Sequence, residues 1–378
     1  MPRPLAPSLF LAILLLVLFF PAPGSARVKL VALPEREGTV LRLDNPAAAL
    51  VEEERLLTLQ QGINEVDFSW KGVQVDEDSI RLRVLSPADG ATVLNVSYPP
   101  DENALVWEMH ATNPLEAKVR ISYLLSGMDR LIAYKGVANR AETRLDFKTY
   151  MVLRNFSGEH FENARIVLGA GRSYERSTTH GETQRLLLLK RDALPIKKIW
   201  TFDARKLPWD PQKLDRNVGI PVSYRIRNDR EHRLGEFVLW SGKARIYQRD
   251  GSNGTIFLGE DRTELVPIGE ETGIRIGKSR DIVVTQRKKL SRRVNVRRNE
   301  DNQIVLHDVE EIVEAKIENF KEGPATLTLL EQIPGEWEMR DCNREYVRRD
   351  AHTLEFTIDL QARGKKSLVM HYVKKHLR

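Results

Sequence analysis

The stretch Val222-Ser223-Tyr224-Arg225-Ile226-Arg227 alternates apolar and polar residues at every step. A strand places successive side chains on opposite faces, so this alternation predicts a strand with one buried face and one solvated face. The same pattern occurs in the stretch 117–123 (AKVRISY) and again in 80–85, 313–317 and 354–360. The sequence therefore predicts a mainly β protein of two or three antiparallel, sandwich-like domains.

Two Glu-rich segments, Val51 to Gln61 and Val309 to Asn319, are the strongest candidates for helices. Their apolar residues lie two apart, as Leu57 and Leu59 do, and neither segment has a sustained apolar stripe at helical spacing. We therefore expect both segments to be strands.

Turn residues support the same fold class. The clearest hairpin joins Ala244 to Gln248 with Thr255 to Leu258 through the turn 250–254 (DGSNG), whose Asp-Gly and Asn-Gly pairs supply the positive φ angles of a tight reversal. Several other strand-like runs end at an asparagine, which makes Asx-turns and tolerates left-handed backbone. These asparagines, which we expect to terminate strands, are Asn45, Asn113, Asn155, Asn228 and Asn319.

The N-terminus has the layout of a secretory signal peptide. Arg3 is followed by an apolar run of 12 residues from Leu9 to Phe20, and small residues lead up to Ala26. We expect residues 1–26 to be a signal peptide cleaved between Ala26 and Arg27; the alternative is an uncleaved anchor, although the run is short for a bilayer span. We expect the exported chain to have no transmembrane span after signal removal and to reside in the periplasm or outside the cell.

Proline-bearing and polar stretches predict the domain boundaries. The break at 99–103 (PPDEN) separates an N-terminal β domain, 27–100, from a middle β region, 104–219, in which a long loop is expected near 200–219. A C-terminal β-sandwich region is expected over 220–378.

Composition excludes several classes of protein. With 41% hydrophobic residues the chain is too apolar to be disordered, and a single cysteine cannot form an internal disulfide or a cysteine-rich zinc site. The balance of 59 Lys+Arg against 53 Asp+Glu is a small basic excess, and it is unevenly distributed. Seven cations, which we call the basic stripe, lie close together: Arg287, Lys288, Lys289, Arg292, Arg293, Arg297 and Arg298.

The basic stripe has two interpretations. If Val294 and Val296 point inward, Arg293, Asn295 and Arg297 share a solvated strand face that could bind an anionic polymer or acidic headgroups. The pattern favours the other interpretation, an edge strand that its charges protect against aggregation. Nucleic acid is not an expected partner, because no aromatic residue interleaves with these cations.

No motif in the sequence is typical of a known catalytic activity. Gly277-Lys278-Ser279 has the end of a phosphate-binding loop without its glycine spacing, so we expect a strand followed by a turn. Asp250 begins a stretch that imitates a calcium loop, but the twelfth place holds Asp261 instead of glutamate. We therefore expect no metal, no cofactor and no catalytic residues.

Several segments resemble a bacterial exported family of unknown function, found at the C-terminus of mucoidy-inhibitor-like proteins. They include the stretches 244–251 (ARIYQRDG), 257–261 (FLGED) and 331–337 (EQIPGEW), within a resemblance that runs from roughly Glu108 to Arg378. The long coiled coil of that family is missing, and so is its tryptophan near Leu131. The resemblance implies an exported β fold and brings no established catalytic residues.

Together these observations predict an exported, non-enzymatic binding or assembly module of the cell envelope or extracellular space. Its expected partner is an envelope polysaccharide or protein. The alternative is a hydrolase of envelope polymers whose carboxylates converge only in the fold, with Glu260 and Asp261 the first candidates.

Overall fold

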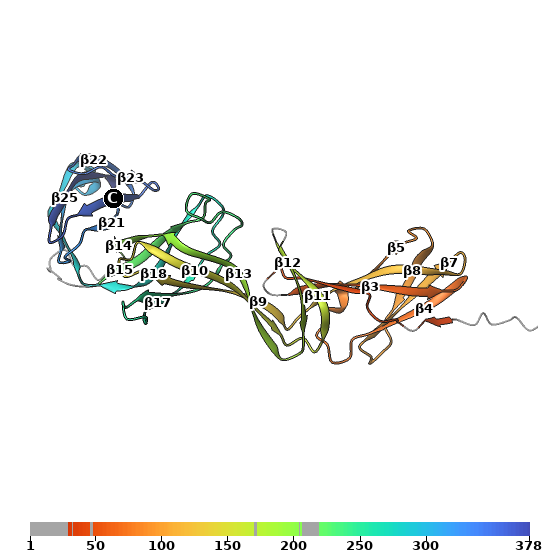
Figure 1. Ribbon diagram of the computed structural model, residues 1–378. Coiled ribbons are helices and arrows are strands. Elements are labelled where there is room, and N and C mark those ends of the chain that lie inside the picture. Colours follow the sequence, from red (N-terminus) through yellow and green to blue (C-terminus); the bar gives the residue numbers. More distant parts are fainter. Residues whose placement is uncertain (1–28, 32, 46–47, 170–171, 204, 206–218) are drawn as a thin grey trace, which may run out of the picture. The chain divides into compact units, whose positions relative to one another are not determined.

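The computed structural model describes residues 29–31, 33–45, 48–169, 172–203, 205 and 219–378. The expected signal peptide, with its cleavage site between Ala26 and Arg27, lies outside these residues. Within them the fold is mainly β, with 25 strands, one 3-10 helix at Glu77–Ser79 and five mostly antiparallel sheets (Figure 1). None of the helices in the described part of the chain is long and apolar enough to cross a membrane.

The chain divides into two compact units, each built from two segments of sequence. Unit 1 contains residues up to Asp129 together with Arg154–Glu182. Unit 2 contains Arg130–Leu153 together with Thr183–Arg378.

Unit 1 is a sandwich of two sheets, which we number 1 and 2. The ring centroids of Phe68 from sheet 1 and Tyr123 from sheet 2 lie 5.7 Å apart, so the two inner faces meet in one aromatic core. In sheet order, sheet 1 contains β1 (Lys29–Val31), β4 (Gly62–Ser69), β7 (Ala104–Ala111) and β6 (Ala91–Ser97). Sheet 2 contains β12 (Arg172–Thr178), β11 (Phe161–Leu168), β2 (Gly38–Arg42), β3 (Ala49–Leu59), β8 (Leu115–Leu125) and β5 (Arg81–Ser86).

Unit 2 contains sheets 3, 4 and 5. In sheet order, sheet 3 contains β13 (Glu182–Pro195), β10 (Arg144–Asn155), β9 (Met128–Ala138), β16 (Gly242–Arg249) and β17 (Thr255–Thr263). Sheet 4 contains β18 (Glu271–Ser279), β15 (Ile220–Arg227), β14 (Lys197–Asp203), β21 (Ala325–Gln332), β24 (Thr353–Leu360) and β23 (Val347–Arg348). Sheet 5 contains β19 (Ile282–Arg298), β20 (Ile304–Asn319), β25 (Lys365–Leu377) and β22 (Glu336–Cys342).

Sheet 4 packs against both of the other sheets in unit 2. Tyr134 and Phe147 of sheet 3 line one small apolar space together with Ile226 of sheet 4, so these two sheets face each other. Farther along sheet 4, the Glu331 side chain accepts a hydrogen bond of 2.8 Å from Gln286 of sheet 5. Unit 2 therefore contains two sandwich-like pairs of sheets with sheet 4 in common.

The strand predictions for the Glu-rich segments are confirmed. Val51 to Gln61 falls largely in β3, where alternate residues are buried, and Val309 to Asn319 falls in β20. The predicted hairpin is also confirmed, as β16 and β17, with positive φ at Gly251 (92°) and Asn253 (63°).

The expected domain boundaries require correction. The stretch 99–103 is the turn between β6 and β7, which pair in sheet 1, so the boundary expected there falls inside unit 1. Residues 104–129 belong to unit 1, while 130–153 fold with the C-terminal part of the chain in unit 2. Within the long loop expected near 200–219, residues 200–203 belong to β14, which pairs with both β15 and β21; of the rest of that stretch, only residues 205 and 219 are described.

Asparagine ends strands in both units, as the sequence predicts. Asn155 is the last residue of β10, Asn228 follows β15 and Asn319 is the last residue of β20; all three side chains are buried. Each side-chain amide bonds backbone groups of neighbouring loops: Asn228 Nδ2, for instance, donates to the carbonyls of Phe237 and Val266 at 3.0 and 3.1 Å. Asn155 and Asn319 make equivalent bonds to turn backbone. A buried amide thus satisfies backbone groups that the end of a strand leaves open.

Candidate functional site

The basic stripe lies on β19, which is an edge strand of sheet 5. Four of its seven cations form ion pairs with glutamates of the neighbouring strand β20. These pairs are Arg287 with Glu314 (2.8 Å), Lys288 with Glu311 (2.6 Å), Lys289 with Glu314 (3.0 Å) and Arg292 with Glu310 (2.5 Å). Three glutamates therefore compensate the first part of the run, from Arg287 to Arg292, across the hairpin.

The distal end of the stripe differs from the expected regular face. Asn295 has a positive φ of 50°, and the pairing register shifts between Val294 and Arg297. Because this bulge breaks the alternation, Val296 is 40% exposed instead of pointing inward. Arg298 donates to the carbonyl of Asn302 at 2.7 Å. Within the described residues, Arg293 and Arg297 have no carboxylate partner.

Glu260 and Asp261, the first candidates for a hydrolytic pair, do not converge. They are consecutive residues of β17, so their side chains point to opposite faces of the sheet. Lys243 and Arg245 hydrogen-bond Glu260 at 3.0 and 2.7 Å and lower its pKa below the usual value. Asp261 accepts the backbone N–H of Arg275 at 2.7 Å. Glu260 therefore lacks the raised pKa that a general acid needs, and Asp261 lies on the other face of the strand.

The two loop motifs serve turns and strands. Gly277-Lys278-Ser279 forms the end of β18, as expected, with no helix following it. Asp250 Oδ1 accepts the backbone N–H groups of Ser252 and Gly254 at 2.7 and 2.9 Å, so the carboxylate is used within its own turn.

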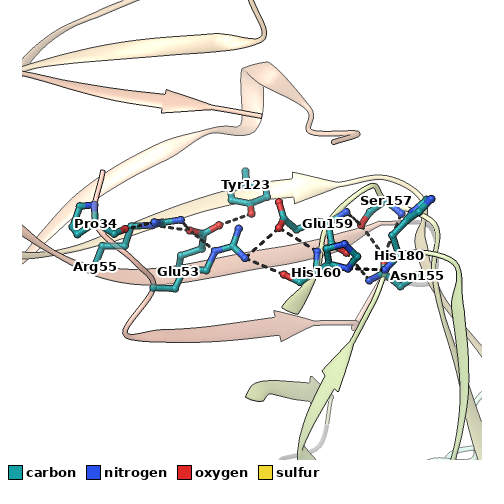
Figure 2. A network of polar contacts seen from close by, with 10 residues as sticks. Pro34, Glu53, Arg55, Tyr123, Asn155, Ser157, Glu159, His160 and His180 are labelled. Atoms are coloured by element: carbon teal, nitrogen blue, oxygen red, sulfur yellow. Dashed lines mark hydrogen bonds and ion pairs between the residues drawn. The ribbon is translucent and has the colours of Figure 1, made fainter. Parts of the chain in front are cut away.

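Figure 2 shows a network of polar contacts in unit 1 that includes Glu53, Arg55 and Tyr123. Glu53 faces the sandwich core with no exposed surface, and its Oε2 lies 3.0 Å from Arg36 Nε and 2.9 Å from Arg55 Nε. The Tyr123 hydroxyl donates to Glu53 Oε1 at 2.5 Å, and Arg36 Nη1 donates to the His160 carbonyl at 3.2 Å. Because the carboxylate is enclosed and fully paired, this network ties the loop after β10 to the sandwich and offers no access to a substrate.

The histidines beside this network are also used in turns. His160 Nδ1 accepts the backbone N–H of His180 at 3.2 Å, and His180 Nδ1 accepts the backbone N–H of Gly158 at 3.0 Å. Both side chains are exposed at the surface of unit 1. Their hydrogen bonds connect the β10–β11 loop with the β12–β13 turn (Figure 2).

A small acidic cluster follows β15. Asp229, Glu231 and His232 bring one possible ligand atom each within 4.8 Å of one another. Asp229 Oδ1 lies 2.7 Å from His232 Nδ1, and its Oδ2 lies 2.9 Å from Arg227 Nε. An arginine thus already neutralises the central carboxylate, and these contacts account for the cluster as a turn.

The outer face of sheet 3 gathers a different set of cations. On β9 and β10, Tyr134 and Phe147 point inward toward sheet 4 and are buried, so Lys135, Lys148 and Tyr150 lie on the outer face. This face bears a cleft of about 580 Å³, which is within the range of ligand sites. Its walls come from β9, β10, β13 and the β16–β17 hairpin: Lys135, Val137, Asp146, Lys148, Lys190, Asp192, Arg249, Gly251, Asn253, Gly254 and Thr255.

A second, smaller space of about 140 Å³ adjoins the cleft and shares Lys135 with it. Together the two spaces are lined by seven cations and two carboxylates. The residues that line the smaller space are Ala133, Tyr134, Lys135, Tyr150, Arg185, Lys243, Arg245 and Tyr247. We call these two lined spaces the sheet 3 face.

Both carboxylates of the cleft have partners. Asp146 accepts the backbone N–H of Ala193 at 3.0 Å and pairs with Arg249, and these interactions lower the pKa of Asp146 below its usual value. Asp192 lies 3.4 Å from Lys190 Nζ. A glycoside hydrolase needs one carboxyl with a raised pKa, and the arrangement around Asp146 does the opposite.

Three cations of the sheet 3 face have no carboxylate partner within the described residues. These are Lys135, Lys148 and Arg185. The Arg185 guanidinium lies 5.0 Å from the centroid of Tyr150, and Lys135 Nζ lies 5.3 Å from the centroid of Tyr247. The face therefore presents uncompensated positive charge beside two half-buried tyrosine rings.

This face could not be predicted from a single run of residues, because its cations are scattered between residues 135 and 249. One local signal was present: in the stretch 243–249 (KARIYQR), a cation or tyrosine occupies every second position. That alternation predicts a hairpin strand, and it also places Lys243, Arg245 and Tyr247 on one face of that strand.

Comparison with known proteins adds no assignment. A scan against protein-family models finds no match for this chain, and a search of curated proteins finds no relative. The resemblance to the C-terminal domain of mucoidy-inhibitor-like proteins stays a prediction from the sequence segments that carry it.

Proposed function

We propose that the protein is an exported, non-enzymatic binding module of the cell envelope or extracellular space that holds an anionic polymer on the sheet 3 face. The observation that carries this proposal is the cleft of about 580 Å³ whose cations Lys135 and Lys148 lack carboxylate partners in the described part of the chain. Export is supported by the signal-like N-terminus of the sequence.

The dimensions of the face favour a polymer over a small anion. Lys243 lines the smaller space and Arg249 lines the cleft, six residues farther along β16. At roughly 3.3 Å per residue the face extends about 20 Å along that strand. A linear polyanion lying there would meet several cations in succession, and its affinity would fall with added salt.

The test is binding of polygalacturonate to the full exported chain by titration calorimetry, with neutral dextran as the control polymer. We expect binding to polygalacturonate that weakens at high salt and no binding to dextran. Replacing Lys135, Lys148 and Lys190 by glutamine should weaken binding by about tenfold, a free energy of about 1.4 kcal/mol.

A matched variant controls for net charge. Replacing Arg292, Arg293 and Arg297 of the basic stripe by glutamine removes the same three charges elsewhere in unit 2 and should leave the affinity within about twofold. Loss of binding in the stripe variant alone would overturn the assignment of the sheet 3 face. Absence of any salt-sensitive binding would overturn the proposed function itself.

A further inference from the structure

The sheet 3 face combines positive charge with aromatic rings, and this combination restricts the chemistry of its ligand. Tyr150 on β10 and Tyr247 on β16 both line the smaller space, on the two strands that flank β9. On β9, Ala133 pairs with Lys243 and Val137 pairs with Tyr247, so Tyr247 lies four residues farther along the strands than Ala133. The two rings therefore lie on either side of β9 and line the same space.

Each ring is covered by a cation that has no carboxylate partner within the described residues. Arg185 lies over Tyr150 at 5.0 Å, and Lys135 lies over Tyr247 at 5.3 Å. At an exposed site, an aromatic face holds a cation less strongly than a charge-assisted hydrogen bond to an anion does. An anionic group that binds Arg185 or Lys135 would therefore draw the cation aside and uncover the ring.

The uncovered rings would then offer flat apolar surfaces beside the bound anionic group. A sugar ring has a face of C–H groups that packs on an aromatic side chain, whereas a polyphosphate has no such surface. The ligand that uses both features carries acid groups and ring faces in alternation along one chain.

We propose that the ligand of the sheet 3 face is an acidic polysaccharide, whose carboxylates contact Lys135, Lys148 and Arg185 and whose sugar rings pack on Tyr150 and Tyr247. This assignment rests on the proposed function, since it names the chemical class of the polymer bound at the same site. Within the hairpin, Tyr247 also contacts Phe257 at 5.4 Å between ring centroids, which fixes the position of one of the two rings.

The experiment compares two polyanions on one set of variants. Oligogalacturonate and polyphosphate of similar charge are titrated into the full chain, into a Tyr150→Leu, Tyr247→Leu double variant and into a Tyr150→Phe, Tyr247→Phe control. We expect the leucine variant to lose about tenfold in affinity for oligogalacturonate and less than about twofold for polyphosphate. The phenylalanine control keeps the rings and should bind both as the natural chain does. Circular dichroism checks that each variant keeps the β fold.

The outcomes separate this inference from the proposed function. Equal loss of both ligands in the leucine variant, or no loss of either, would overturn the polysaccharide assignment while leaving an anion-binding face in place. Failure of the natural chain to bind either polyanion would overturn both. Selective loss of oligogalacturonate supports the assignment.

Discussion

Unit 2 carries two basic surfaces in which the same number of cations lack a carboxylate partner within the described residues, but the two surfaces are assembled differently. The basic stripe on β19 is continuous in the sequence, yet four of its seven cations pair with Glu310, Glu311 and Glu314 on the adjacent strand. The sheet 3 face is assembled from β9, β10, β13 and β16, and four of its seven cations also pair, with Asp146, Asp192 and Glu260. Its remaining cations, Lys135, Lys148 and Arg185, have no carboxylate partner within the described residues and lie beside a cleft.

The difference lies in how each surface is built. Along β19 the cations are close together in the sequence, and the neighbouring strand brings glutamates opposite to four of them. On the sheet 3 face, cations that are isolated in the sequence meet on several strands beside a cleft and two tyrosine rings. Charge density along the sequence therefore reveals the first surface and not the second.

The largest expected effect on stability comes from removing one of the glutamates that pair with the basic stripe. Glu311 is 3% exposed and receives hydrogen bonds from Lys288, Lys374 and Tyr372; burial alone would raise its pKa, but these bonds outweigh burial and lower it. Replacing Glu311 by glutamine leaves two partly buried ammonium groups without their counter-ion and should reduce the free energy of unfolding by about 3 kcal/mol. Urea denaturation of the full chain measures it.

An exposed ion pair of unit 2 provides the control for that variant. Glu322 pairs with Arg363, but its side chain is 83% exposed. Replacing Glu322 by glutamine should leave the free energy of unfolding unchanged within the error of the measurement, because water screens an exposed ion pair. If both variants lose the same stability, the ion pairs of Glu311 stabilise the fold no more than an exposed ion pair does.

A second buried glutamate, Glu331, contacts β19 through Gln286, and its pKa is shifted in the opposite direction to that of Glu311. Glu331 accepts a hydrogen bond from Gln286, and burial raises the pKa of Glu331 from 4.5 to about 7. Since the folded-state pKa lies above that of the unfolded chain, the contribution of Glu331 to stability is present below about pH 4.5 and is lost as the pH rises through 7.

The variant Glu331→Gln should remove this dependence. Near pH 5 its stability should be close to that of the natural chain, while near pH 8 the variant should be more stable by roughly 3 kcal/mol, because no charge has to be buried. Urea denaturation at both values of pH measures the difference. A difference that does not change with pH would show that Glu331 does not titrate in this range.

More of the fold than of the candidate site could be predicted from the sequence. Alternation at Val222–Arg227 and in the segments of β3 and β20 predicts strands correctly, because a half-buried strand imposes a period of two on its own residues. The break at 99–103 was misplaced as a boundary, since a proline-bearing hairpin turn and a linker have the same composition. The sheet 3 face depends on pairing between β9 and β16, which lie about a hundred residues apart, and no local pattern fixes that contact.

A smaller effect, on the affinity for the polymer, is expected from removing a carboxylate of the sheet 3 face. Asp192 lines the cleft with a side chain that is 64% exposed, and it lies 3.4 Å from Lys190. Asp192→Asn removes a negative charge from the face and should raise the affinity for polygalacturonate by a few fold, equivalent to at most about 1 kcal/mol. Glu322→Gln makes the same change in net charge away from the cleft and should leave the affinity unchanged. Equal gains in the two variants would mean that only net charge matters.

The smallest expected change in stability concerns the unpaired end of the stripe. Arg293 and Arg297 are exposed and have no carboxylate partner within the described residues, so Arg293→Val with Arg297→Val should alter the free energy of unfolding by less than about 0.5 kcal/mol. Because β19 is an edge strand, the loss of these charges should instead promote pairing between chains, which analytical ultracentrifugation detects as faster sedimentation. Lys148→Val makes a similar exchange on β10, an interior strand of sheet 3, and should not promote association. If the edge variant sediments as the natural chain does, these arginines do not protect the edge.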